Sequence, residues 1–192
     1  MGPSRPLLER RFHAADLAQT QRLAWALGQH LLGASAGGVV LTLTGDLGAG
    51  KTTFVRALAR GAGLPEAVPV PSPTFIVAQR FTLPGGVELC HADAYRLGAA
   101  SEWEAAGGEE MLGAGRLTCV EWAERIPGAL PDDHLEVELM PHAVPPGLPR
   151  AGEVAGVPAE PPVARWLVLR AWGPESARHL RGFRAPWPEQ AS

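Results

Sequence analysis

The chain has 192 residues, of which 46% are hydrophobic, and its formal net charge is −3. This length and composition fit one domain with a sizeable core and contain no run long enough to span a membrane. The acidic balance argues against a protein that holds a nucleic-acid backbone unaided, because such domains are usually basic.

The first part of the chain predicts a tail, a helix, a strand and a second helix. Residues 1–10 are expected to be a flexible tail, followed by a single domain over residues 11–192. A helix is predicted from Asp16, which can cap the N-terminus of an apolar pattern at helical spacing. The β-branched run 39–45 stops at glycine, which is typical of a buried parallel strand. Residues 51–60 predict the next helix, and glycines end it.

The rest of the chain alternates strand and helix patterns. The prolines of segment 68–75 favour an extended, exposed loop. Two strands joined by the turn signal at 83–87 follow, and then a helical pattern broken by glycines over 95–112. Further strands are predicted over 117–122, over 134–140 and from Arg165, and a short final helix is predicted from Pro174.

Residues 141–163 are rich in proline and glycine, and we expect an insertion or linker without secondary structure. The alternation of strands and helices predicts an α/β fold. We expect a single P-loop NTPase-like domain, with a mostly parallel sheet flanked by helices and this proline-rich insertion near the C-terminus.

The segment GDLGAGKTT, residues 45–53, matches the phosphate-binding motif G-x-x-x-x-G-K-[ST] between a predicted strand and a predicted helix. The glycines let backbone N–H groups converge, and the helix directs its positive end at the same place. In this motif Lys51 reaches the β- and γ-phosphates and the Thr52 hydroxyl binds Mg²⁺. The residues expected to contact ATP are Gly45, Asp46, Gly48, Ala49, Gly50, Lys51, Thr52, Thr53 and Trp122.

Lys51 is the only lysine in the chain, and the other cations counted among the 17 Lys and Arg residues are arginines. Lysine is a compact point charge on a thin stem, whereas arginine is a wide planar fork. A loop that encloses phosphates closely therefore accepts the ammonium and not the guanidinium. The chain also lacks asparagine, so the N-K-x-D or T-K-x-D box that binds guanine is absent and ATP is favoured over GTP.

Two carboxylates are suited to the Mg²⁺ side of the site. Asp93 and Glu121 each end an apolar run, and in a parallel sheet both emerge at the edge where the phosphate loop lies. Each can also be a solvated carboxylate or a helix cap. His91 shares a strand face with Asp93, and we interpret it as a core or hydrogen-bonded histidine in preference to a zinc ligand.

Thr74 lies in a proline-rich loop after the phosphate-loop helix, where nucleotide-sensing segments of small NTPases are found. Its hydroxyl can bind the γ-phosphate or Mg²⁺, or it can stabilise a turn. Trp122 is either a core residue or a contact residue. Lys51, Asp93, Glu121 and Thr74 are thus the candidate catalytic residues, and Thr52, Glu121 and Asp93 the candidate metal ligands.

Cys90 and Cys119 both lie inside apolar runs, which indicates buried thiols in a reducing compartment. The N-terminus lacks the apolar core of a signal peptide. We therefore expect a soluble, cytoplasmic protein.

Four segments, GDLGAGKTTFVRAL, SPTF, HADAYRL and VEWAERI, resemble the TsaE (YjeE) family in their order and spacing. These are the bacterial ATPases of tRNA threonylcarbamoyladenosine biosynthesis. The resemblance covers roughly residues 12–140 and resumes at Arg165. The phosphate loop alone is generic, but its combination with H-x-D-x-Y-R-L and V-E-W is specific.

The resemblance implies a weak ATPase that binds ATP and Mg²⁺ and acts with TsaB and TsaD. TsaD transfers threonylcarbamoyl to adenosine 37 of tRNA, so tRNA is contacted through the partners, and neither DNA nor a membrane is involved. By motif, Thr52 and Glu121 serve Mg²⁺, Asp93 positions metal or water, Thr74 belongs to a switch loop, and Trp122 lies beside the nucleotide or partner. The alternatives are an independent small-molecule kinase and a nucleotide-binding switch without turnover.

Overall fold

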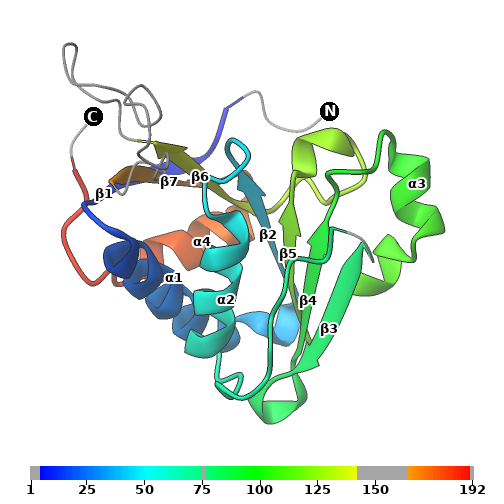
Figure 1. The fold of residues 1–192 in the computed structure, drawn as a ribbon, viewed down its shortest axis with the longest axis horizontal. Helices are drawn as coiled ribbons and strands as arrows, with labels where there is room; N and C mark the ends of the chain where they lie inside the picture. The colour runs from blue at the N-terminus through cyan, green and yellow to red at the C-terminus, as the bar shows by residue number, and fades with distance from the viewer. Residues whose placement is uncertain (1–4, 75–76, 142–163, 191–192) are drawn as a thin grey trace, which may run out of the picture.

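The structure, a computed structural model, describes residues 5–74, 77–141 and 164–190 (Figure 1). The proline-rich segment 142–163, expected to be an insertion, lies outside the described residues. The strands are β1 (Leu8–Ala14), β2 (Val39–Thr44), β3 (Ala78–Thr82), β4 (Glu88–Asp93), β5 (Arg116–Glu121), β6 (Leu135–Pro141) and β7 (Arg165–Ala171). The helices are α1 (Leu17–Leu32), α2 (Lys51–Gly61), α3 (Ala100–Ala105) and α4 (Pro174–Gly182).

The strands form one seven-stranded sheet in the order β1-β7-β6-β2-β5-β4-β3. Strands β6, β2, β5 and β4 pair in parallel, and β7 and β3 run against their neighbours. All strands except β7 and β3 therefore point the same way. The predicted α/β fold, with a mostly parallel sheet flanked by helices, is confirmed.

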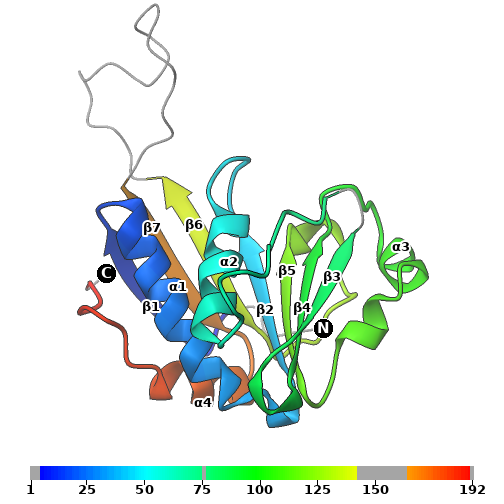
Figure 2. The same cartoon turned by 60° about the horizontal axis from the view of Figure 1, so that its bottom comes forward.

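The core lies mainly between the sheet and α1, α2 and α4, which cover one face (Figures 1 and 2). The α1 helix begins as predicted, because the Asp16 side chain accepts a hydrogen bond from the Gln19 N–H at 2.6 Å. Helices α1 and α2 approach so closely that a Cβ at Gly28 would lie 2.0 Å from the Leu58 carbonyl oxygen. The packing of α1 against α2 thus requires glycine at position 28.

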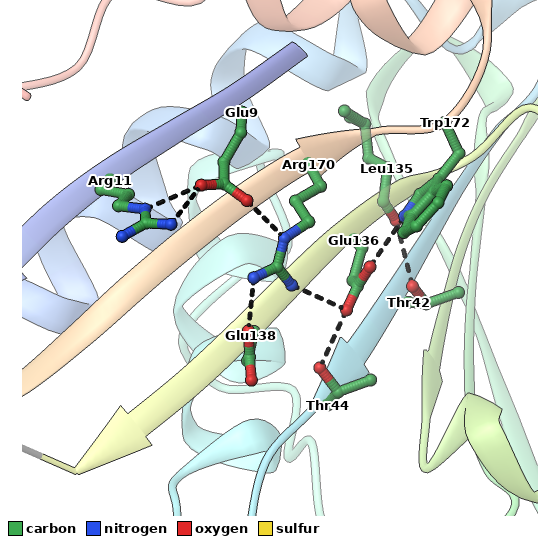
Figure 3. Close-up of polar contacts among 9 residues, drawn as sticks. All are labelled: Glu9, Arg11, Thr42, Thr44, Leu135, Glu136, Glu138, Arg170 and Trp172. Atoms are coloured by element: carbon green, nitrogen blue, oxygen red, sulfur yellow. Dashed lines mark hydrogen bonds and ion pairs between the residues drawn. The ribbon is translucent and has the colours of Figure 1, made fainter. Parts of the chain in front are cut away.

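The opposite face of the sheet is divided into two regions. Over β4 and β5, α3 and short 3₁₀ turns bury a second apolar cluster that includes Trp103, Met111 and Ile126. Over β1, β7 and β6, outward-facing charged side chains meet in a network around Arg170 (Figure 3). Strand β6 accordingly alternates between buried and partly exposed residues, as expected of a strand with one core-facing side.

Two predicted boundaries need correction. The flexible tail expected over residues 1–10 is wrong for its last part, because β1 begins at Leu8 and pairs with β7 along its whole length. Consecutive charged residues at the start of β1 conceal the alternation that Phe12 and Ala14 complete, and both of these are fully buried. Pro141, expected in the insertion, is the last residue of β6.

The predictions about cysteines and membrane spans can be compared with the described part of the chain. Cys90 and Cys119 are both free and buried. Burial raises the pKa of the Cys90 thiol to about 11, and it also raises the pKa of Cys119. In the ranges that the structure describes, no helix has the length and apolar character needed to cross a bilayer.

Candidate functional site

The phosphate loop joins β2 to α2 as the sequence predicts. Gly45, Gly48 and Gly50 have φ angles of 131°, 80° and 99°, values that side-chain-bearing residues rarely adopt. At Gly45 a Cβ would also lie 2.4 Å from the Leu139 carbonyl oxygen of β6. The loop therefore curls tightly against the end of a neighbouring strand.

Lys51 is the first residue of α2, and its side chain is folded back into the loop. The Nζ donates to the carbonyl oxygens of Gly45 at 2.6 Å and Asp46 at 2.9 Å. It also lies 3.6 Å from the centroid of the Trp122 ring, a favourable cation–π position. Burial lowers the pKa of Lys51, while the negative charge of Glu121 opposes this shift. Lys51 as a whole is only 4% exposed.

Trp122 covers the lysine from the turn after β5. Its φ of 59° places a bulky residue in the left-handed region, where such residues are uncommon. Its N–H donates to the carbonyl oxygen of Leu43 in β2 at 3.1 Å, which ties this turn to the strand before the phosphate loop. The Tyr95 ring packs against it at 5.2 Å. The structure thus places Trp122 against Lys51, and its predicted place beside the nucleotide or a partner stays a prediction.

Asp93 and Glu121 end neighbouring parallel strands and lie opposite each other in the register. The structure therefore brings the two predicted carboxylates together. Glu121 accepts hydrogen bonds from the Thr52 hydroxyl at 2.8 Å and from His91 Nε2 at 2.8 Å. Nδ1 of His91 is buried and has no hydrogen-bond partner within the described ranges. His91 therefore holds Glu121 in place from the core side.

Asp93 holds the loop that follows α2. It accepts a hydrogen bond from the Thr74 hydroxyl at 2.5 Å and from the Tyr95 N–H at 2.9 Å. The Ser72 hydroxyl lies 2.6 Å from that of Thr74. Thr74 is thus attached to a candidate metal ligand, although it comes from a segment far from β4 in the sequence.

These groups surround a pocket of about 240 Å³. Its lining includes Leu47, Gly48, Gly50, Lys51, Thr52, Ser72, Thr74, Asp93, Tyr95, Glu121 and Trp122. Four other residues expected to contact ATP, namely Gly45, Asp46, Ala49 and Thr53, do not line it. The contacts of all nine expected residues with ATP stay predictions. A larger hollow of about 640 Å³ lies against β1 and the C-terminal segment, and none of these chemical groups faces it.

Sequence reasoning gave no functional role to Ser72, Tyr95 or Arg165. The first two lie within the quoted motifs SPTF and HADAYRL, so their neighbours in those motifs could have indicated them. Arg165 begins a strand far along the chain, and its Nη1 donates to the Ala49 carbonyl oxygen at 2.6 Å. No sequence pattern indicates this last contact.

The donor set of the pocket suits Mg²⁺. Carboxylate and hydroxyl oxygens are hard ligands, and Mg²⁺ is usually held by one or two carboxylates together with substrate phosphates and water. The described residues contain no group of three or more His, Cys, Asp and Glu side chains arranged to hold a metal ion by themselves. The oxygen ligands at the pocket fit an ion that arrives with a polyphosphate.

Comparison with known proteins places the chain in a family. A family profile described as "Threonylcarbamoyl adenosine biosynthesis protein TsaE" matches residues 14–144. The chain belongs to the TsaE family. A curated relative from Bacillus subtilis, named tRNA threonylcarbamoyladenosine biosynthesis protein TsaE, is 41% identical over 100 residues. That match covers 52% of this chain and 60% of the relative, which is less than two thirds of its length.

Other relatives agree with this assignment. A protein of the same name from Nostoc is 39% identical over 121 residues, covering 59% of this chain and 67% of the relative. The crystal structure of YdiB from Bacillus subtilis superposes with a TM-score of 0.65 at 24% identity, covering 92% of this TsaE-family chain and 94% of YdiB. At this identity the superposition shows a shared fold.

Proposed function

We propose that this TsaE-family chain binds ATP with Mg²⁺ and hydrolyses it in support of tRNA threonylcarbamoyladenosine biosynthesis. The pathway comes from the family and from the printed names of its relatives. In this proposal TsaD transfers threonylcarbamoyl to adenosine 37 of tRNA, and the chain acts in a complex with TsaB and TsaD. The tRNA is contacted through these partners.

The observation that carries the proposal is the meeting of one buried cation and two carboxylates around a single small pocket. Among the described residues, the close partners of Lys51 Nζ are two carbonyl oxygens and an aromatic ring, and Glu121 and Asp93 line the same pocket. The pocket volume of about 240 Å³ is below the ~300–1,000 Å³ of sites that enclose a whole ligand. It therefore suits the phosphate end of a nucleotide, with the base outside.

Each residue then has a role in ATP hydrolysis. Thr52 and Glu121 are the residues that would hold Mg²⁺, which when bound neutralises charge on the phosphates. Lys51 exchanges its carbonyl partners for phosphate oxygens, which restores the charged form that burial disfavours. Asp93, together with Thr74, positions the attacking water.

Turnover by the chain alone is expected to be slow. No arginine or glutamine of the described chain lines the pocket. P-loop enzymes without such a group in cis hydrolyse slowly, and supplying it in trans raises the rate by roughly 10³–10⁵-fold. TsaB and TsaD act either by supplying this group or by ordering the loop that carries Thr74.

The experiment is steady-state ATP hydrolysis by the purified chain, with TsaB and TsaD titrated in. We expect slow turnover alone and an acceleration of about tenfold or more in the complex. Lys51→Ala should abolish both rates. Arg178→Ala is the matched control, because this exposed residue of α4 pairs only with Glu175 on its own helix in the described structure.

Three results would separate the alternatives. Equal rates with and without the partners would contradict partner activation. Turnover that requires a small-molecule acceptor would identify a kinase. Tight ATP binding without turnover in the complex would identify a nucleotide-binding switch.

A further inference from the structure

Strand β7 carries two arginines with opposite surroundings. Arg170 faces the open side of the sheet, where carboxylates from β1 and β6 surround its guanidinium (Figure 3). Its nitrogens lie 2.7 Å from Glu9, 3.3 Å from Glu136 and 2.7 Å from Glu138. This is the ordinary arrangement, in which a partly buried cation is neutralised by anions.

Arg165 has no such partners in the part of the chain that the structure describes. It is 8% exposed, and no carboxylate of the described residues lies within ion-pair distance of it. Its Nη1 donates to the Ala49 carbonyl oxygen at 2.6 Å, and its Nε is buried without a hydrogen-bond partner in the described chain. Burial lowers the pKa of this guanidinium, and no charge on the described residues opposes the shift. A buried charge without an anion is costly to keep.

The bonded carbonyl belongs to the phosphate loop. The Ala49 C=O and the Gly50 N–H are parts of one peptide group, and the described chain has no cis peptide bonds. In a trans peptide these two groups point in opposite directions. Arg165 therefore fixes both groups by holding one of them.

The Gly50 N–H points away from Arg165, because the Ala49 carbonyl is bonded to that arginine. Gly50 lines the pocket and Arg165 does not. No described residue accepts a hydrogen bond from the Gly50 N–H. The arginine also packs directly on Gly50, because a Cβ there would lie 2.6 Å from Nη1. The absence of a side chain at Gly50 thus makes room for Arg165. The arginine lies on one side of the loop, and the Gly50 N–H points to the other side.

We propose that Arg165 is a positioning residue of the phosphate loop, which holds the Ala49 carbonyl outward so that the Gly50 N–H faces a bound polyphosphate. This inference rests on the proposed function for the identity of the anion. An N–H donor that is already fixed in place needs no reorganisation when the polyphosphate binds. The positive charge of Arg165, which no described carboxylate neutralises, further favours a polyphosphate at this place.

The test compares Arg165→Met, Arg165→Lys and Arg170→Met by two measurements. The first is the Kd for ATP with Mg²⁺, by titration calorimetry. The second is the amide resonance of Gly50 in the ligand-free protein, by ¹⁵N–¹H NMR. Arg170→Met is the control, because it removes the same side chain from the same strand on the face without the pocket.

We expect Arg165→Met to raise the Kd about tenfold or more and to shift the Gly50 resonance. Arg165→Lys keeps the positive charge and a donor group. Its Kd and its Gly50 resonance should therefore lie between those of Arg165→Met and of the unchanged protein. It also remains measurable if Arg165→Met does not fold. Arg170→Met should lower the melting temperature and leave the Kd within about twofold of the unchanged protein.

The outcomes separate this inference from the proposed function. Reduced stability of both Arg165 variants, with an unchanged Kd and Gly50 resonance, would show a merely structural arginine and overturn the inference. If the unchanged protein binds no ATP but Arg165→Met still shifts the Gly50 resonance, the proposed function fails and the positioning role stands.

Discussion

Replacing Glu121 by glutamine separates the binding of Mg²⁺ from the stability of the fold. The substitution keeps the shape of the side chain and removes its charge. Glu121 is 3% exposed and accepts hydrogen bonds from Thr52 and His91. The amide of glutamine still offers one oxygen acceptor, and its NH₂ group can face the Thr52 hydroxyl, which also accepts hydrogen bonds.

The effect on the fold is expected to be small. Hydrogen bonds to charged groups contribute about 1.5–3 kcal/mol and those between neutral groups about 0.5–1.5 kcal/mol. The two bonds therefore lose roughly 2–3 kcal/mol together. The neutral side chain also escapes the cost of burying a carboxylate, which is several kcal/mol per ion. Because these effects oppose each other, we expect the free energy of unfolding to change by no more than about 2 kcal/mol.

The effect on Mg²⁺ is expected to be large. Two unit charges 4 Å apart attract each other by about 4 kcal/mol at an effective dielectric constant of 20. Losing even two thirds of this attraction weakens binding about 100-fold. ATP binding without Mg²⁺ should change little, and Mg²⁺-dependent binding and hydrolysis should be lost.

The assay is an Mg²⁺ titration of ATP affinity, with urea unfolding on the same samples. Glu136→Gln is the control, because Glu136 is also hydrogen-bonded but lies on the open face away from the pocket. Normal Mg²⁺ dependence in Glu121→Gln would refute the assignment of Glu121 as a metal ligand. A loss of Mg²⁺ dependence accompanied by global unfolding would refute the argument for small stability effects.

Three further predictions concern other parts of the chain. Lys51→Ala should weaken ATP binding about tenfold or more. Lys51→Arg should be nearly as damaging in the same titration, because the wide guanidinium does not fit between two loop carbonyls and the Trp122 ring. Full affinity for ATP in Lys51→Arg would contradict this reasoning. Burial raises the pKa of Asp133, but hydrogen bonds from the N-terminus of α4 outweigh burial and hold this pKa below its ordinary value of 3.8. The unfolding free energy should therefore be retained above pH about 4 and fall at lower pH, and it should fall less steeply in Asp133→Asn in urea titrations at each pH. Gly108→Ala should cost about 1–3 kcal/mol of unfolding free energy in urea denaturation, because the new Cβ would lie 2.1 Å from the Trp103 ring.

Much of the site could be predicted because it follows from local patterns. The phosphate loop is specified by glycines and a lysine within one short segment. Asp93 and Glu121 end apolar runs, and parallel strands present their ends at one edge of the sheet, which is how the structure places them. These predictions needed only the direction of the strands.

The remaining features depend on contacts between distant segments. Strand β1 has three charged residues in succession, and its strand character comes from pairing with β7 near the other end of the chain. The contact between Lys51 and Trp122 depends on a left-handed turn at a bulky residue, which no propensity predicts. The hydrogen bond from Arg165 to Ala49 likewise depends on how the start of β7 lies against the phosphate loop.

The same distant contacts explain how the site can be formed before any nucleotide arrives. Lys51 and Thr74 are each held by a segment other than their own, Lys51 by the Trp122 ring and Thr74 by Asp93. Because these partners are themselves polar or aromatic groups of the pocket, a bound polyphosphate must take over contacts that already exist. Binding therefore exchanges one set of interactions for another, and the net affinity is smaller than the sum of the new contacts. In the proposed function this exchange involves the loop of Thr74 as well as the phosphate loop. We therefore expect any partner that moves the Thr74 loop to change the affinity for ATP, and by linkage we expect ATP to change the affinity for that partner.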